Sequence, residues 1–273
     1  MKIISADKIK NAVSDLCVRA NLVLRGDVLG ALKSAYLSET NSRAKRILEA
    51  IICNASIAQK EKIAICQDTG LPYVFAELGN GLHVRGDLIK AINAGVEAGY
   101  RKASLRNSVV RNPLQRARPV YTPAVIHIDA VKGDKLKLTV FPKGFGAENK
   151  SQIKMFNPTA AISEIRKFIL EAVKAAGPDA CPPYVVGVGI GGTADYAMYL
   201  AKKALLRRIS KGASGMERAL LKEINNLNIG PMGLGGKTTC LGVNVETYPT
   251  HIAGLPVAVN ISCHALRSAS ALL

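Results

Sequence analysis

The sequence predicts a mixed α/β (α+β) fold, in which a helical N-terminal layer precedes a mixed sheet with flanking helices. Residues 5–60 carry apolar side chains at helical spacing, whereas later segments contain short alternating or fully apolar runs typical of strands, separated by further helical stretches. With 48% hydrophobic and 21% charged residues, the composition is that of a globular protein. No internal repeat, low-complexity tract or linker is visible, so we expect residues 1–273 to form a single domain.

The N-terminal layer, residues 1–60, is predicted to contain three helices. Its apolar stripes are interrupted at Gly26 and at residues 40–42, where a glycine and a Thr-Asn-Ser cluster favour breaks. The turn residues at 131–134 predict a β-hairpin between the two strands that flank them. From residue 61 onward we expect a helix at 87–102 and strands at 62–66, 73–78, 120–129 and 135–141.

Helices and strands alternate in the second half. Asn157 as N-cap and Pro158 at the first helical position predict a helix that ends at Gly177. An apolar strand at 184–190 leads into a helix from 194 to about 210. After it we expect a helix at 216–226, a glycine-rich loop at 230–236, and strands at 241–245 and 256–263.

The chain is strongly basic, with 37 basic and 20 acidic residues and a formal net charge of +17. Nucleic-acid binding is one explanation, because Lys and Arg neutralise phosphates, and the densest acid-free basic stretch spans residues 101–118. However, Trp is absent and only 5% of residues are aromatic, so the stacking side chains of single-strand binders are missing. We therefore expect an anionic small-molecule substrate and an acidic partner surface rather than nucleic acid.

The expected cellular compartment affects how the six cysteines are interpreted. No apolar run approaches the roughly 20 residues that a membrane helix needs, and residues 1–7 lack the features of a secretion signal. We expect a cytoplasmic protein, in which thiols stay reduced. The six cysteines contain no C-x₂-C pair, which excludes zinc-finger and ferredoxin spacings. Cys17, Cys53 and Cys240 are expected to be small hydrophobic side chains.

Cys66, Cys181 and Cys263 stand in contexts typical of iron–sulfur ligands. Cys66 is followed by Gln-Asp-Thr-Gly, Cys181 by Pro-Pro-Tyr ahead of a glycine-rich strand, and Cys263 by His-Ala. The alternative is that they too are buried small hydrophobic side chains. A cubane held by three thiolates leaves one iron open as a Lewis acid, which suits catalysis rather than electron transfer.

Two glycine-rich segments allow both a functional and a structural interpretation. Residues 187–192 match G-x-G-x-x-G, but the acidic residue that a dinucleotide site wants about 20 positions on is replaced by basic residues such as Arg207 and Arg208. The segment is then either tight strand–helix packing or an anion site at a helix N-terminus. Residues 143–151 are either a plain surface turn or a loop whose amide, ammonium and hydroxyl donors bind a carboxylate.

Taken together, these segments resemble the class I, iron–sulfur-dependent fumarate hydratases and the related L(+)-tartrate dehydratases. More narrowly, the chain resembles the α subunit of the two-subunit form. The matching stretches are CQDTG (66–70), KGFGAENKS (143–151), CPPYVVGVGIGGT (181–193), GPMGLGGKTT (230–239) and YPTHIAGLPVAVNISCHALR (248–267).

The resemblance implies a role for each matching residue. A [4Fe–4S] cluster is implied on the thiolates of Cys66, Cys181 and Cys263. Asp68 and His251 are implied as the catalytic pair, a workable proton-transfer system beside a Lewis-acidic iron. The implied substrate contacts are Gln67, Asp68, Arg106 and Gly146.

The resemblance also implies an activity and a partner. The implied reaction is the reversible hydration of fumarate to (S)-malate, with L(+)-tartrate dehydration as the alternative and a basic nucleic-acid-binding module as a remote one. In single-chain members a C-terminal region supplies the base that takes the C3 proton. The present sequence ends at Leu273 without such a region. We therefore expect a separate β chain and an αβ or (αβ)₂ assembly.

Overall fold

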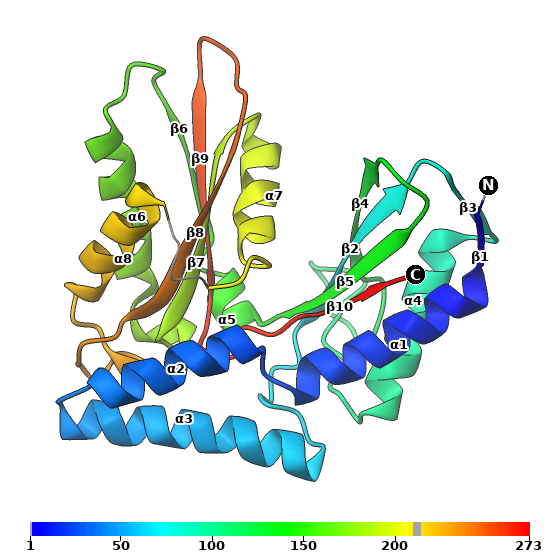
Figure 1. The fold of residues 1–273 in the computed structure, drawn as a ribbon, viewed down its shortest axis with the longest axis horizontal. Helices are drawn as coiled ribbons and strands as arrows, with labels where there is room; N and C mark the ends of the chain where they lie inside the picture. The colour runs from blue at the N-terminus through cyan, green and yellow to red at the C-terminus, as the bar shows by residue number, and fades with distance from the viewer. Residues whose placement is uncertain (1, 210–213) are drawn as a thin grey trace. The chain divides into compact units, whose positions relative to one another are not determined.

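The structure, a computed structural model, describes residues 2–209 and 214–273 (Figure 1). The chain divides into two compact units. The first comprises residues 1–25, 55–144 and 267–273, and the second comprises residues 26–54 and 145–266. Each unit contains one four-stranded sheet. The expectation that residues 1–273 form a single domain stays a prediction.

The first unit is a sheet packed against two helices, with strand order β10-β5-β2-β4. Strand β2 (Leu71–Gly79) is antiparallel to β5 (Leu136–Lys143) and parallel to β4 (Val125–Val131), and β10 (Ala269–Leu272) adds antiparallel to β5. Helices α1 (Ala6–Leu22) and α4 (Leu88–Lys102) pack against each other and share a core with the sheet (Figure 1). A short parallel pair, β1 (Lys2–Ser5) and β3 (Leu82–Arg85), completes the unit.

The second unit has helices on both faces of a sheet with strand order β6-β9-β7-β8. Strand β7 (Tyr184–Gly191) lies between β9 (Leu255–Ser262) and β8 (Cys240–Tyr248), and β6 (Gln152–Phe156) forms one edge. Helices α6 (Ile162–Ala176) and α8 (Gly215–Asn225) cover the face that carries Val186 and Val188, and α7 (Ala194–Ala204) covers the other (Figure 1). The second unit also contains α2 (Gly26–Ser38), α5 (Phe145–Glu148), and the 3₁₀ turns η1 (Gly177–Ala180) and η2 (Pro231–Gly233). Helix α3 (Ser42–Glu61) belongs to this unit up to residue 54 and to the first unit from residue 55.

The glycines of the G-x-G-x-x-G segment serve strand–helix packing. A Cβ at Gly187 or Gly189 would overlap the backbone oxygen of Ala201 or Ala197 in α7. The carboxylate of Asp195 lies in the first turn of the same helix, where it suits the helix dipole and bonds the Thr193 hydroxyl at 2.6 Å. Of the two interpretations that the sequence allowed, the contacts of these glycines support close packing.

Most of the predicted elements are confirmed. The predicted helical region 5–60 forms α1, α2 and α3 from Ala6 onward, and the predicted helices at 87–102 and 216–226 correspond to α4 and α8. The helix predicted from 194 to about 210 forms as α7 but ends at Ala204, and Ser210 lies outside the described residues. The strands predicted at 73–78, 184–190, 241–245 and 256–263 correspond to β2, β7, β8 and β9. The sequence analysis did not predict β1, β3, β6 and β10.

The predicted β-hairpin is wrong. Its two strands exist as β4 and β5, but both pair with β2, which lies between them. Turn residues at 131–134 allow the chain to reverse, and they do not determine which strand fills the middle of the sheet.

Two further predictions are wrong for local reasons. Residues 62–66 form no strand, because the Ile65 N–H bonds the Asn21 carbonyl instead of a neighbouring strand. Helix α6 begins at Ile162 rather than near Asn157, whose side chain instead accepts hydrogen bonds from Thr159. The N–H of Ala161, just before the helix, bonds the Glu164 carboxylate at 2.8 Å.

Within the described ranges, no helix has both the length and the apolar composition needed to span a membrane.

Glu217 ties α8 to β8. Its buried carboxylate accepts hydrogen bonds from the backbone N–H groups of Ser214 (2.7 Å) and Val245 (2.8 Å) and from the Arg207 guanidinium (3.0 Å). Burial acts to raise the pKa of Glu217, but these donors outweigh it and the pKa is lowered.

Replacing Glu217 with Gln should lower the free energy of unfolding by about 1–3 kcal/mol at pH 7, because a buried acceptor is lost. Since the folded-state pKa is lowered, the stabilisation is complete above the ordinary value of 4.5 and disappears as pH falls through the folded value. Urea denaturation at pH 7 and at progressively lower pH should show the wild type approaching the variant. Glu171→Gln, which removes an exposed ion pair with Lys167, is the control. A difference that stayed constant down to acid pH would contradict this account.

Candidate functional site

The turn that carries Cys66, Gln67 and Asp68 belongs to the first unit and leads into β2. Cys66 is half-buried, and its thiol lies 3.3 Å from Oε1 of Gln67. The Asp68 carboxylate accepts a hydrogen bond from the Gly70 N–H at 3.0 Å, which closes the turn.

Two glycines make room around this turn. Gly70 has a φ of +78°, and a Cβ there would lie 2.8 Å from the backbone nitrogen of Lys143. A Cβ at Gly144 would lie 3.2 Å from the Asp68 carboxylate. The beginning of the predicted 143–151 loop therefore packs directly on the Asp68 turn, which a larger residue at either glycine would displace.

Thr69 connects the turn to Arg106. The Thr69 hydroxyl accepts a hydrogen bond from the Arg106 N–H and donates one to the Arg106 carbonyl, both at 3.1 Å. Thr69 is buried, whereas the Arg106 side chain is exposed. The backbone of Arg106 is thus held against Thr69, the residue after Asp68, whereas the substrate contacts of Asp68 and Arg106 stay predictions.

Two buried donors hold the carbonyl groups of the same turn, and the sequence analysis assigned a role to neither. The guanidinium of Arg267 donates to the Asp68 carbonyl. The Tyr100 hydroxyl lies 3.0 Å from the Thr69 carbonyl and 3.2 Å from that of Gly70. Burial raises the pKa of Tyr100, so this hydroxyl keeps its proton and donates. A signal for Arg267 was present in the sequence, as the last residue of the quoted stretch 248–267.

Cys181 and Cys263 come together in the second unit, although 82 positions separate them. Strands β7 and β9 are antiparallel with Val185 opposite Ser262, so the chain just before β7 lies beside the chain just after β9. The carbonyl of Cys181 accepts a hydrogen bond from the His264 N–H at 3.3 Å and lies 3.0 Å from Nδ1 of the same residue. Cys181 itself has a left-handed backbone with φ of 53°.

The glycine-rich loop at 230–236 packs on the Cys181 turn. The Met232 N–H donates to the Pro182 carbonyl at 2.9 Å, and a Cβ at Gly233 would overlap Pro178. Two of the family-like stretches, 181–193 and 230–239, are therefore structural neighbours.

Gly146 lies in the second unit, where a Cβ added to it would be 3.4 Å from the Asp179 carbonyl. Nearby donors of the 143–151 loop are engaged within the protein: the Lys150 ammonium bonds Asp179 at 2.8 Å, and the Ser151 hydroxyl donates to the Glu148 carbonyl at 2.7 Å. For these two side chains a structural role is therefore supported. The substrate contact of Gly146 stays a prediction.

His251 lies in the loop between β8 and β9 and is exposed. Its Nδ1 accepts a hydrogen bond from the Ala253 N–H at 3.1 Å, so the neutral ring carries its proton on Nε2. Asp68 belongs to the first unit and His251 to the second, and their pairing stays a prediction.

The six cysteines fall into three groups by exposure. Cys17 and Cys240 are buried, and burial raises the pKa of each thiol to about 12. Cys66, Cys181 and Cys263 are each partly exposed, as thiols that bind an external group must be. Cys53 is exposed, contrary to the expectation of a buried small side chain. In the described part of the chain, no three His, Cys, Asp or Glu side chains are grouped closely enough to hold a single metal ion.

The buried side chain of Tyr184 follows the Cys181 turn in the sequence. The hydroxyl of Tyr184 has no hydrogen-bond partner among the described residues. Its pKa is raised mainly by burial and to a lesser degree by the nearby Cys181 and Cys240 thiols. The hydroxyl therefore stays protonated and can donate a hydrogen bond. An unused donor near a thiol fits a bound group that brings additional sulfur acceptors.

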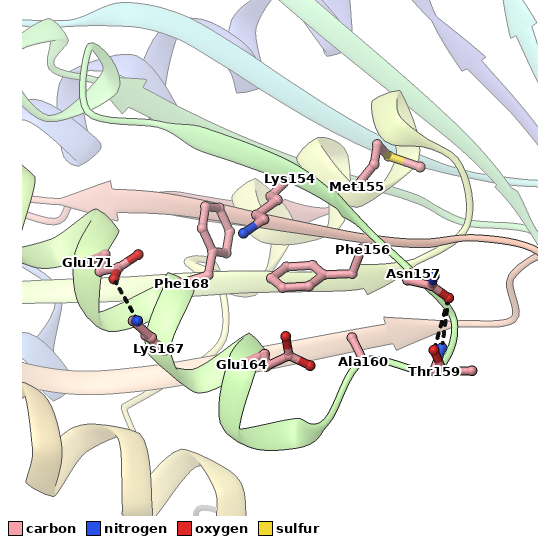
Figure 2. A pocket seen from close by; sticks show the side chains of 10 residues that line it. All are labelled: Lys154, Met155, Phe156, Asn157, Thr159, Ala160, Glu164, Lys167, Phe168 and Glu171. Atoms are coloured by element: carbon pink, nitrogen blue, oxygen red, sulfur yellow. Dashed lines mark hydrogen bonds and ion pairs between the residues drawn. The ribbon is translucent and has the colours of Figure 1, made fainter.

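A cavity of about 540 Å³ between β6 and α6 contains none of the predicted site residues (Figure 2). Its polar groups largely interact with one another or with ring faces: Lys167 pairs with Glu171, Asn157 bonds Thr159, and Lys154 lies over the Phe156 ring. These contacts favour a structural role for this cavity.

Comparisons with known proteins identify the family of this chain. The family described as "Fumarate hydratase (Fumerase)" matches residues 10–272. A protein of Methanocaldococcus jannaschii, named provisionally as an L(+)-tartrate dehydratase subunit alpha, is 41% identical over 275 residues, covering 96% of each chain. The protein named L(+)-tartrate dehydratase subunit alpha in Escherichia coli O157:H7 is 28% identical over 278 residues, covering 98% of this chain and 92% of its own. The chain belongs to the fumarate hydratase family of hydro-lyases.

Proposed function

We propose that this chain is the cluster-binding α subunit of a hydro-lyase that interconverts fumarate and (S)-malate. The observation that carries the proposal is the structural pairing of Cys181 with the Cys263 segment, because two partly exposed thiols distant in sequence are held at neighbouring strand ends. The family match supports the class of reaction.

Cys66, Cys181 and Cys263 would hold the [4Fe–4S] cluster. Arg267 supports the inclusion of Cys66, because its guanidinium holds the carbonyl of Asp68, and it follows Cys263 by only four residues. When bound, such a cluster supplies a Lewis-acidic iron, since three protein thiolates leave one of its four irons without a protein ligand. Tyr184 would donate its unused hydrogen bond to a sulfur acceptor.

The chain's own side chains would perform proton transfer and substrate orientation. Asp68 would protonate the departing hydroxide during dehydration, and its backbone is held on both sides by Arg267 and by the Thr69–Arg106 hydrogen bonds. The exposed guanidinium of Arg106 would pair with one substrate carboxylate.

The other predicted residues would complete the substrate contacts. Gln67 and Gly146 would contact the substrate, through a side-chain amide and through a backbone that a small residue leaves accessible. His251, with its proton on Nε2, would be the partner of Asp68.

A second polypeptide would complete the site. The curated relatives are named as alpha subunits and are matched over 96% and 92% of their own length. A β chain would then supply the base that removes the C3 proton, in an αβ or (αβ)₂ assembly. The surplus positive charge of this chain suits an acidic partner surface and a dianionic substrate. A cytoplasmic location would keep the ligand thiols reduced.

L(+)-tartrate dehydration is the second candidate, favoured by the names of the relatives. Tartrate differs from malate by one additional hydroxyl, which needs a donor or acceptor of its own in the site. With the β chain present, anaerobic turnover of fumarate, (S)-malate and L(+)-tartrate should give the higher kcat/KM for the fumarate–malate pair. A higher kcat/KM for tartrate would select the second candidate, and no turnover of any of the three would remove both.

Replacing Cys66, Cys181 or Cys263 with Ala should each abolish cluster binding, because a cubane does not stay bound through two thiolates alone. Iron and acid-labile sulfide are measured on anaerobically purified and reconstituted protein, together with circular dichroism to verify folding. Cys53→Ala, which removes an exposed thiol outside the proposed set, should keep full iron content. Full iron content in any of the three variants would make the ligand assignment wrong for that residue.

Arg267 should act as a positioning residue for Asp68. Arg267→Met should lower kcat about tenfold or more while the iron content is retained, because the Asp68 carbonyl loses a buried charged donor. Arg267→Lys should recover part of the loss, since it restores a donor and the charge.

The control for Arg267 is Arg19→Met, which removes an exposed guanidinium that also donates to a backbone carbonyl of the first unit, that of Ser270. Arg19→Met should leave kcat unchanged. Wild-type kcat in folded Arg267→Met would show that the contact is structural only.

A further inference from the structure

The basic stretch at 101–118, of which the proposed function uses only Arg106, contributes three other arginines to a cavity of the first unit. The cavity has a volume of about 500 Å³. Its lining includes Glu97, Arg101, Asn107, Arg111, Arg118 and Tyr121. Three of the chain's arginines thus face one concave surface, of a size that accepts a small ligand.

Backbone pairing holds together the loop that lines this cavity. Val109 and Val120 form an isolated antiparallel bridge with N···O distances of 3.0 and 2.7 Å, and Val109 is buried whereas Val120 is half-buried. The Asn107 side chain donates to the Pro119 carbonyl at 2.8 Å. These contacts join the two arms of the loop that carries Arg111 and Arg118, and both residues line the cavity.

The charges in the cavity do not cancel. Arg101 is neutralised by Glu97 through contacts at 3.0 and 2.7 Å and also lies over the Tyr121 ring at 4.8 Å. Within the residues that the structure describes, neither Arg111 nor Arg118 has a hydrogen-bond or ion-pair partner for its guanidinium. The cavity therefore holds two uncompensated positive charges beside a fixed ion pair.

We propose that this cavity is a binding site for a small dianion, either inorganic phosphate or a dicarboxylate. A dianion neutralises both guanidinium groups, and carboxylate and phosphate oxygens match the forked donors of arginine. Its lining contains none of the residues proposed for catalysis, substrate binding or cluster binding. A single-stranded nucleic acid would instead contact the whole basic stretch through its phosphate groups.

Isothermal titration calorimetry of the full chain with inorganic phosphate, and separately with succinate, tests the site. At least one of the two should bind, and Arg118→Gln and Arg111→Gln should each weaken binding about tenfold, as expected for the loss of a charge-assisted pair. Arg116→Gln is the matched control, because Arg116 lies in the same loop, carries the same charge and does not line the cavity. Binding that survives Arg106→Gln separates this site from the proposed substrate site.

Each outcome decides the proposal. Binding of phosphate alone or succinate alone identifies the class of dianion. No binding of either below about 10 mM overturns the proposal. Equal weakening by Arg116→Gln and Arg118→Gln, together with salt-sensitive binding of a single-stranded oligonucleotide, would show a diffuse basic surface and also overturn it. Loss of binding in Arg106→Gln alone would assign the anion to the substrate site.

Discussion

The turn at residues 66–70 depends on hydrogen bonds from residues far away in the sequence. Its carbonyl groups are held by the guanidinium of Arg267 and the hydroxyl of Tyr100, and Thr69 bonds the backbone of Arg106 in both directions. A buried guanidinium is costly to desolvate and stays in place only where it makes good hydrogen bonds. The rigidity of this turn is what allows a side chain such as Asp68 to be aimed, because a proton donor must be held close to its target.

The second unit uses strand register for a similar purpose. Antiparallel pairing of β7 with β9 sets Val185 opposite Ser262, and this register brings the segment after Cys181 beside the segment before Cys263. The face of β7 with Gly187 and Gly189 admits α7 at close range, while Val186 and Val188 contribute to the core on the other face. A one-residue slip of β7 would exchange these faces, so the tight helix contact also fixes where the Cys181 turn lies.

The basic side chains of this protein are of two kinds. Some form ion pairs with carboxylates of the protein itself, such as Lys150 with Asp179 and Lys202 with Glu148. Others, such as Arg111 and Arg118, face a cavity without such partners among the described residues. The first kind joins neighbouring segments of the second unit, and the second kind is available to anions from solution. Net charge alone does not distinguish them, because both contribute equally to the value of +17.

The sequence by itself determined the mixed fold class, most helices and strands, and the residues that resemble a known family. These features are local: apolar periodicity, caps and short motifs are properties of neighbouring residues. The tertiary structure alone decided that β2 lies between β4 and β5, because strand pairing depends on which edges meet and not on the intervening turn. Only the tertiary structure identified Arg267 and Tyr100 as the hydrogen-bond donors to the Asp68 turn. A hydrogen bond between residues 68 and 267 cannot be predicted from the pattern of the residues between them.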